Sequence, residues 1–303
     1  MTMRPYDHDK DFLRVRDFLV TTYGHFRRSY NWTIERWNFS VSLARTMHAI
    51  SLDVWAAQIG IWEAAGEIQA VVNAEGEDDG EAFFQLRHED LPKALLPELF
   101  AFCEARMGKV EGDARRIRLY VPAGDVRLER MAAEHGYARE GWVDHDGVLT
   151  VGDAFPVALP EGYTFADGAA VSAEEKGAAH AAAFGYAGEP PYPERAIVGF
   201  RRMQATPDYR ADLDLHVRAP DGRIVSFATM WYDAQNRIGI LEPVGTAPAY
   251  RRSGLGRAAI YEGINRIRAE GAVRVHVGSD QAFYQRIGFV IHDKYTVWQK
   301  HVI

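Results

Sequence analysis

The feature that most constrains the fold is an order of structural elements that occurs twice along the 303 residues. Segments 54–89 and 213–246 each read as three strands joined by turns, at Ala65-Gly66 and Asp79-Gly80 in the first and at Asp221-Gly222 and near Gln235-Asn236 in the second. Helical patterns precede both segments, and a longer helix follows each, at residues 94–107 and 255–271. A short strand, a short helix and a closing strand pair complete each half. We therefore expect an α/β (α+β) chain in two tandem domains, each a mixed, mostly antiparallel sheet flanked by helices.

The spacing of matching residues supports a duplication. Gly66 and Gly222 are 156 residues apart, and Gly136 and Gly288 are 152 apart. Self-similarity at a domain-sized period indicates tandem copies. Segment 150–168 is rich in proline and glycine and has no helical period. We place the boundary there, which predicts domains 1–155 and 156–303.

Composition excludes several classes of protein. No apolar run approaches the ~20 residues of a membrane helix, and the first 15 residues have no apolar core of a signal peptide. The chain has one cysteine, Cys103, so it has no internal disulfide, which favours a cytoplasmic location. Cys103 lies in a helical pattern and is expected in the core. A formal net charge of -7 argues against nucleic-acid binding. We expect no membrane partner and no metal.

The loop before the second long helix has two possible interpretations. Residues 254–259 formally match G-x-G-x-x-A, the dinucleotide fingerprint. That fold needs several further parallel strands, and only 23 residues follow Asp280, so we reject it. The structural alternative is an ordinary helix start with surface arginines.

The physics of the loop favours a phosphate. Gly254 and Gly256 allow backbone N–H groups to face a ligand at the start of a helix, where unpaired amides favour an anion. Arg251, Arg252 and Arg257 add positive charge around that point.

In its wider context this loop resembles motif A of the GNAT superfamily of N-acetyltransferases, R/Q-x-x-G-x-G/A, with Arg251, Gly254 and Gly256 at the motif positions. The segment "FYQRIGF" at 283–289 resembles the second landmark of that family, a tyrosine on a short helix before a Gly-Phe strand start. By element order the resemblance covers residues 160–303. The segment before the tyrosine is shorter than in many members, so the asparagine that commonly touches the cofactor arm has no counterpart.

The resemblance implies acetyl-CoA as cosubstrate, with its pantetheine arm along residues 241–246 as an added strand and its pyrophosphate on the amides of 252–257. The implied binding residues are Val244, Gly245, Thr246, Arg251, Arg252, Ser253, Gly254, Leu255, Gly256 and Arg257.

Acetyl transfer to an amine needs a base, an oxyanion donor and an acid. Glu242 interrupts an apolar strand, where burial would raise its pKa and suit it as the base; the alternatives are an outward-facing glutamate or an arginine partner. The family implies the N–H of Val244 as oxyanion donor and Tyr284 as acid. The alternative for Tyr284 is simple packing on the last helix. His180 and His276 are weaker candidates for substrate contact.

The first half lacks the phosphate loop. No glycine occurs between Gln85 and Phe102, and Glu89 and Asp90 stand where a phosphate would bind. We interpret this half as a degenerate GNAT-like domain that supports the second. The acidic segment 75–81 is expected to be a solvated turn.

These observations predict an acyltransferase that moves an acetyl group to a primary amine of a small molecule or peptide by direct attack. The alternatives are a non-catalytic acyl-CoA-binding sensor, a small-molecule acetyltransferase with the tandem layout of mycothiol synthase, and an aminoacyl transferase that uses charged tRNA. The acidic net charge disfavours the last of these.

Overall fold

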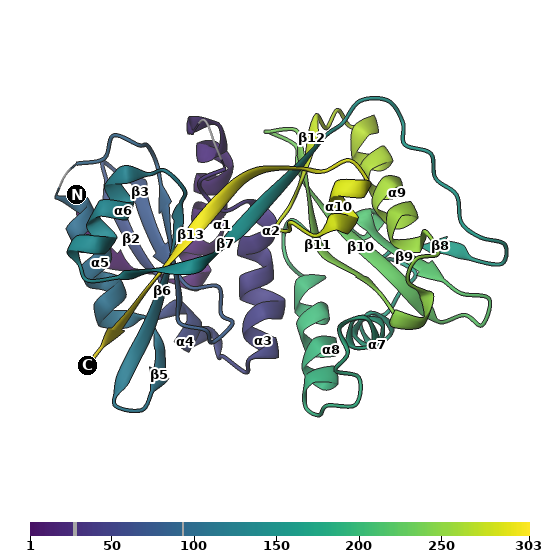
Figure 1. The fold of residues 1–303 in the computed structure, drawn as a ribbon, viewed down its shortest axis with the longest axis horizontal. Coiled ribbons are helices and arrows are strands. Elements are labelled where there is room, and N and C mark those ends of the chain that lie inside the picture. Colours follow the sequence, from purple (N-terminus) through teal and green to yellow (C-terminus); the bar gives the residue numbers. More distant parts are fainter. Residues whose placement is uncertain (27–28, 93) are drawn as a thin grey trace. The chain divides into compact units, whose positions relative to one another are not determined.

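The computed structural model describes residues 1–26, 29–92 and 94–303. The chain forms two compact units (Figure 1). Unit 1 comprises Met1–Asp146 and His292–Ile303, and unit 2 comprises Gly147–Ile291. The predicted division into 1–155 and 156–303 concerns the two sequence repeats and stays a prediction. The compact units are defined differently, by spatial contacts, and unit 1 includes the last 12 residues of the chain.

Unit 1 contains an outer strand, a helical region, three strands, and then alternating helices and strands. Its strands are β1 (Thr2–Pro5), β2 (Gly60–Ala64), β3 (Glu67–Asn73), β4 (Glu81–Leu86), β5 (Lys109–Glu111) and β6 (Ala114–Pro122). Its helices are α1 (His8–Thr22), α2 (Ile34–Phe39), α3 (Arg45–Met47), α4 (Leu52–Ala56), α5 (Leu95–Arg106) and α6 (Val126–Glu134), with a 3-10 turn (Tyr23–His25) and a π-helical turn (Ser40–Ala44).

Unit 2 repeats this order. Its strands are β8 (Thr164–Ala166), β9 (Asp214–Arg218), β10 (Ile224–Asp233), β11 (Ile238–Thr246) and β12 (Arg274–Val277). Its helices are α7 (Ala173–Phe184), α8 (Tyr192–Met203), α9 (Leu255–Ala269) and α10 (Ala282–Arg286), with 3-10 turns at Ala211–Leu213 and Pro248–Tyr250.

Each sheet is mostly antiparallel with one parallel pair, which confirms the predicted fold class. Unit 1 runs β1-β2-β3-β4-β6, with β4 and β6 parallel and β5 at the side of β6. Unit 2 runs β12-β11-β10-β9-β8, with β11 and β12 parallel. In both units the helix between the two parallel strands, α5 or α9, makes the crossover.

The closing segment of each half differs from the expected strand pair. Each half ends in one strand of 13 residues, β7 (Ala138–Thr150) or β13 (Val290–Val302). Residues 147–150 of β7 pair antiparallel with β12 of unit 2. Residues 295–302 of β13 pair antiparallel with β6 of unit 1. Each sheet is therefore completed by a strand from the other half of the sequence.

Local signals explain the ends of several elements. The hairpin between β2 and β3 turns at Ala65 and Gly66, both with positive φ, as a two-residue hairpin turn requires. Helix α7 begins with a capping box between Ser172 and Glu175 and ends at Gly185 in the left-handed conformation.

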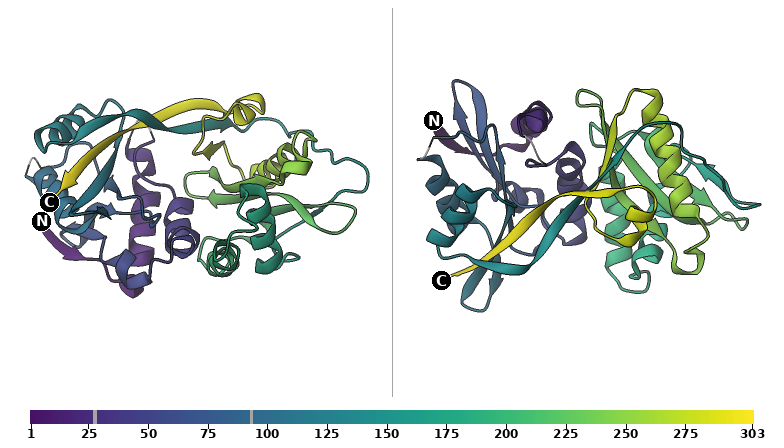
Figure 2. Two further views of the ribbon diagram at one scale, coloured as in Figure 1. Left: turned by 60° about the horizontal axis from the view of Figure 1, so that its bottom comes forward. Right: turned by 45° about the horizontal axis from the view of Figure 1, so that its top comes forward.

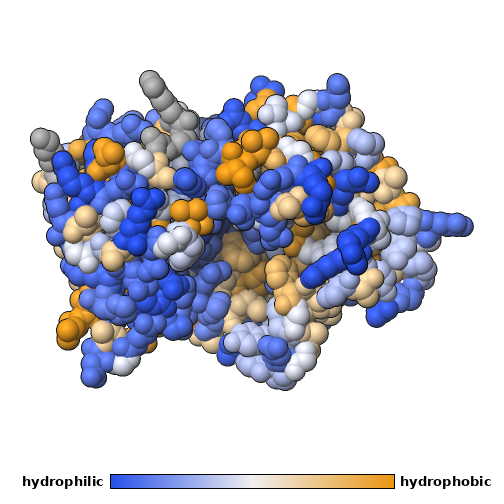
Figure 3. Space-filling view, viewed as in Figure 1, coloured by the Kyte–Doolittle hydropathy of each residue, from blue (hydrophilic) through white to orange (hydrophobic). Residues whose placement is uncertain are grey.

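The apolar cores lie on both faces of each sheet. In unit 1, α5 and α6 cover one face and α1, α2 and α4 the other. In unit 2, α9 and α10 pack on one face, and α7 and α8 lie on the opposite face (Figure 2). Hydrophilic side chains predominate on the surface seen in Figure 3. Within the described ranges, no helix is both long and apolar enough to cross a membrane.

Candidate active site

The centre of the candidate site is an unpaired edge of β11. Strand β11 pairs with β12 only at Ile238, Gly239 and Ile240. From Leu241 onward the two strands separate, and in the described part of the chain no strand covers that edge. An exposed edge offers backbone N–H and C=O groups to an extended ligand.

The register places the Val244 amide on this edge. On the other side, β11 pairs with β10, where Val244 lies opposite Ala228. The N–H of Ala247 donates to the carbonyl of Val225 at 2.9 Å, so these two residues stand at a hydrogen-bonded position of the ladder. Because hydrogen-bonded and non-bonded pairs alternate in antiparallel strands, the N–H of Val244 points away from β10 and toward the unpaired edge.

A bulge in β11 precedes Val244. The β10 register passes from Ala228 opposite Val244 to Met230 opposite Leu241, so Glu242 and Pro243 together face one residue. The indole N–H of Trp231 donates to the backbone oxygen of Glu242 at 2.7 Å. Glu242 itself is partly exposed.

The loop after β11 has the properties of an anion site. In the described chain, no protein acceptor is found for the backbone N–H groups of residues 252–257. Arg252 and Gly254 both have positive φ, at 65° and 85°, and alternating left-handed residues form concave arrays of N–H groups. The array leads directly into α9, whose dipole adds positive potential.

Three glycines in this region, Gly245, Gly254 and Gly256, differ in why a side chain would be unfavourable there. Gly254 needs its positive φ, and a Cβ there would have only Arg257 Nη2 within 4 Å, at 3.8 Å. Gly256 is instead closely packed: a Cβ there would lie 3.1 Å from Thr246 Oγ1, so that side chain would have to move by a few tenths of an ångström. A Cβ on Gly245 would lie 2.5 Å from the ring of Phe227. Only Gly254 is therefore open to a ligand at its α-carbon.

The three arginines of the loop have different surroundings. Arg251 donates from Nε to the carbonyl of Thr246 at 3.0 Å and from Nη2 to the carbonyl of Ala183 at 2.8 Å. It therefore ties the end of β11 to the end of α7. The side chains of Arg252 and Arg257 are exposed beside the amide array. Ser253 donates its hydroxyl to the carbonyl of Tyr250 at 2.5 Å.

Tyr284 lies in the same apolar cluster against which Val244 packs. It is 8% exposed, and in the described residues its hydroxyl has no protein hydrogen-bond partner. Burial, and secondly the negative charge of Glu242, raise the pKa of Tyr284. The structure thus brings Glu242, Val244 and Tyr284 into one neighbourhood, and the phenol stays protonated at neutral pH.

The two histidines considered for substrate contact, His180 and His276, are buried. His180 shares a 2.5 Å hydrogen bond with the hydroxyl of Tyr186 and packs between Phe184 and Phe227. Burial lowers the pKa of His180 to about 3, so the ring is neutral. His276 is 5% exposed on β12.

Two polar pairs lie near this site, and of their four residues only Thr246 was predicted from the sequence. The hydroxyls of Ser226 and Thr246 hydrogen-bond at 2.8 Å beneath the start of α9. Lys176 and Asp214 form an ion pair with no exposed side-chain surface under β10.

The corresponding edge in unit 1 is occupied by the protein itself. Strand β4 pairs with β6 only as far as Phe83. Beyond it, the side chain of Asn31 accepts from the N–H of Leu86 and donates to its carbonyl, both at 2.8 Å. Strand β4 also lacks a bulge against β3. Leu86 thus stands where Val244 stands in unit 2, with its backbone groups already bonded.

The acidic residues of unit 1 that the sequence analysis singled out lie in a loop and a turn. Glu89 and Asp90 are exposed before α5. In the acidic turn 75–81 the carboxylate of Glu81 accepts the N–H groups of Gly76, Glu77 and Asp79. Trp32 and Trp37 are buried in the core of unit 1, and positions 27 and 28 lie outside the described residues. The described part of the chain contains no group of three or more His, Cys, Asp or Glu side chains suited to a metal.

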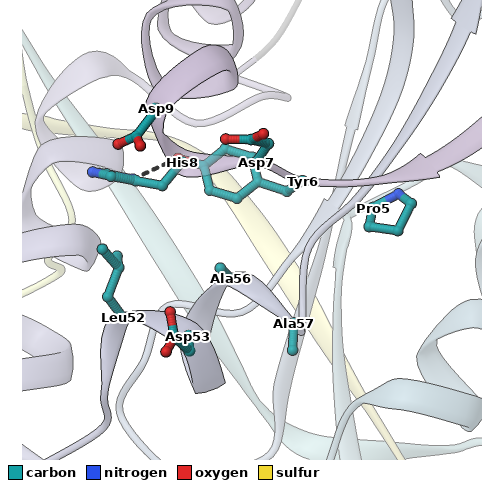
Figure 4. Close-up of a pocket in the computed structure, with 9 residues that line it drawn as sticks. All are labelled: Pro5, Tyr6, Asp7, His8, Asp9, Leu52, Asp53, Ala56 and Ala57. Atoms are coloured by element: carbon teal, nitrogen blue, oxygen red, sulfur yellow. Dashed lines mark hydrogen bonds between the residues drawn. The ribbon is translucent and has the colours of Figure 1, made fainter.

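A surface hollow in unit 1 contains none of the predicted site residues (Figure 4). It lies between the start of α1 and α4, and its rim carries Asp7, Asp9 and Asp53. The hydroxyl of Tyr6 hydrogen-bonds His8 at 3.0 Å.

Comparison with known proteins agrees with this geometry. Residues 181–289 match the family model described as Acetyltransferase (GNAT) family. A glucosamine 6-phosphate N-acetyltransferase of Trypanosoma brucei brucei is 31% identical over 83 residues, which are 25% of this chain and 56% of that protein. The chain therefore spans about half the length of this relative.

Two solved structures share the whole architecture. A tandem GNAT protein from the clavulanic acid biosynthesis pathway has a TM-score of 0.67 at 13% identity and covers 99% of this chain and 98% of its own. A GCN5-related N-acetyltransferase from Sphaerobacter thermophilus has a TM-score of 0.64 at 17% identity, covering 99% and 95%. At these identities the likeness concerns the fold. Residues 181–289 are therefore similar to the acetyltransferase (GNAT) family, and the whole chain has the fold of solved tandem GNAT proteins.

Proposed function

We propose that the protein transfers an acetyl group from acetyl-CoA to a primary amine, in unit 2, by direct attack within a ternary complex. The observation that carries the proposal is the run of backbone groups from Val244 to Arg257. Its first part is an unpaired strand edge, suited to the amide-bearing pantetheine arm. Its last part is an array of N–H groups without protein acceptors, suited to the pyrophosphate.

The residues of this neighbourhood fit the three needs of the reaction. The acceptor nitrogen bonds to the acyl carbon while the carbon–sulfur bond breaks. Glu242 takes the proton that the ammonium must lose, directly or through water. The N–H of Val244 stabilises the oxyanion because it points to the unpaired edge. Tyr284, protonated at neutral pH, gives a proton to the departing thiolate.

We further propose that one chain binds one acetyl-CoA. The side chain of Asn31 already forms two hydrogen bonds on the unit 1 edge, so an added strand has no partners there. The exposed carboxylates of Glu89 and Asp90 would repel a pyrophosphate in front of α5. Unit 1 then has a supporting role.

The expected acceptor is a small molecule or peptide with a free primary amine. The relative of 31% identity is named for glucosamine 6-phosphate, so amino sugars stand first in a panel of acceptors, followed by amino acids and peptides with a free amine. The buried free cysteine is compatible with action in the reducing cytoplasm.

Two measurements test the proposal. Calorimetric titration of the full chain with acetyl-CoA should give one site, and thiol release from the acceptor panel should identify an amine that is acetylated. Binding without turnover on any amine would favour the non-catalytic sensor. No binding, or two molecules of acetyl-CoA per chain, would overturn the proposal.

A further inference from the structure

A buried polar network lies beneath the bulge of β11. The ammonium group of Lys176, on α7, donates to Asp214 Oδ2 at 2.5 Å and to Thr229 Oγ1 at 3.0 Å. The Thr229 hydroxyl donates to Asp214 Oδ1 at 2.8 Å. Tyr209 donates to Asp214 Oδ2 at 2.8 Å. Lys176, Asp214 and Thr229 are 0%, 0% and 1% exposed, so solvent does not take part.

Thr229 connects this network to the candidate site. It pairs with Asp214 on β9, and on its other side it is the residue that faces both Glu242 and Pro243 across the bulge. Two positions along, Trp231 is 1% exposed and its indole N–H holds the backbone oxygen of Glu242. Strand β10 therefore faces the bulge with two residues whose side chains are hydrogen-bonded: Thr229 to the buried network, and Trp231 to the bulge itself.

The backbone ladder alone defines the bulge poorly. A bulge leaves one residue without a ladder partner, and a proline has no N–H to donate. Both effects coincide at Glu242 and Pro243. The position of β10 opposite Glu242 and Pro243 therefore depends more on side-chain contacts than it does where the ladder is regular.

Stability does not explain the network well. Replacing a buried ion pair by apolar residues of similar volume is often neutral or stabilising, because burial of the charges is costly. A network of four polar side chains inside an apolar face is better explained by the geometry that it imposes.

We propose that Lys176, Asp214 and Thr229 are positioning residues: they fix β10 opposite the bulge and so hold Glu242 and the Val244 N–H in their working orientation. The inference rests on the proposed acetyl transfer. It assigns no contact with the substrate to these three residues.

The test uses a matched pair of variants. Thr229→Val keeps the shape of the side chain and removes the hydroxyl, whereas Thr229→Ser keeps the hydroxyl. Thr296→Val in unit 1 is the control, since Thr296 is fully buried and donates to the carbonyl of Val121 at 3.2 Å. All three are measured in the full chain for kcat, acetyl-CoA affinity, Tm, and the indole N–H signal of Trp231, assigned with Trp231→Phe.

We expect Thr229→Val to lower kcat about ten- to hundredfold and to move the Trp231 signal. Acetyl-CoA affinity should fall less than kcat, because the loop 252–257 is untouched and only the strand edge at Val244 is disturbed. Thr229→Ser should restore kcat and the signal. Thr296→Val should lower Tm only. Unchanged kcat with an unmoved signal in Thr229→Val, or a serine variant no better than the valine variant, would overturn the inference.

Failure of the proposed function would look different. If wild type turns over no amine, acetyl transfer is refuted, and the Trp231 signal still decides the positioning. A shift in Thr229→Val that Thr229→Ser reverses supports it, and an unmoved signal refutes it.

Discussion

Gly254 provides the most direct test of the phosphate loop. It begins α9 with φ of +85°, and a side chain there would meet only Arg257 Nη2, at 3.8 Å. Asparagine and aspartate tolerate this backbone conformation better than other side chains and have nearly the same shape. Gly254→Asn and Gly254→Asp should therefore share the same strain and differ only in charge.

The expected difference follows from Coulomb's law. A carboxylate about 6 Å from one phosphate charge, at an effective dielectric constant of about 40, costs about 1.4 kcal/mol. That energy is a factor of about ten in Kd. A second phosphate charge increases the factor, and pairing with the exposed Arg257 reduces it. We expect Gly254→Asp to bind acetyl-CoA about ten- to hundredfold more weakly than Gly254→Asn.

Calorimetry on the two variants, with Tm as the check on folding, measures this ratio. The ratio should shrink at high salt, because the Debye length falls from about 10 Å at 0.1 M to about 3 Å at 1 M. Gly136 supplies the control pair, since it also has positive φ, at +78°, and open space around its α-carbon, but lies in unit 1. Equal affinities of folded Gly254→Asp and Gly254→Asn would refute a pyrophosphate at this loop.

Three further outcomes are expected. Glu242→Gln should lower turnover most at low pH, where the acceptor is an ammonium, and Tyr284→Phe should lower turnover with little change in acetyl-CoA affinity; wild-type rates for both across pH 6 to 9 would contradict these roles. Burial lowers the pKa of His216 from 6.5 to about 4. Between pH 6.5 and pH 4 the unfolded chain therefore binds a proton at this residue that the folded chain does not bind. The free energy of unfolding falls as the pH falls through this window. The effect amounts to about 3 kcal/mol in total, and His216→Leu should flatten the pH dependence of urea unfolding in that window, whereas an unchanged slope would refute it. A fragment of residues 147–291 should fold better than 157–303, because only the former keeps the β7 residues that pair with β12; equal far-ultraviolet circular dichroism and cooperative melting of both fragments would contradict the pairing.

The sequence predicted the parts of the fold that depend on neighbours along the chain. Gly66 and Gly222 mark tight turns because only a few residues adopt positive φ readily. The order of strands and helices followed from hydrophobic periodicity. The amide array of the phosphate loop was also predictable, because glycines just before an amphipathic helix have few other uses.

Contacts between distant residues could not be predicted in this way. The bond from Asn31 to Leu86 spans 55 positions, and the bond from Lys176 to Thr229 spans 53. Nothing local in a short polar side chain reveals such a partner. The assignment of Arg251 to phosphate failed to anticipate its two backbone carbonyl partners for the same reason. The single closing strands were missed because their partners lie in the other half of the sequence.

A comparison of the two units suggests why one fold can be both support and enzyme. Parallel strands that separate leave a backbone edge with unpaired N–H and C=O groups, and such groups need partners. In unit 1 the partner is the side-chain amide of Asn31, and the strand there is regular. In unit 2 no described strand covers the edge, the strand has a bulge at Glu242 and Pro243, and the Val244 N–H points toward the edge. The side-chain amide of Asn31 thus hydrogen-bonds the strand edge in unit 1. We propose that an amide of the acetyl-CoA arm forms the equivalent hydrogen bonds in unit 2.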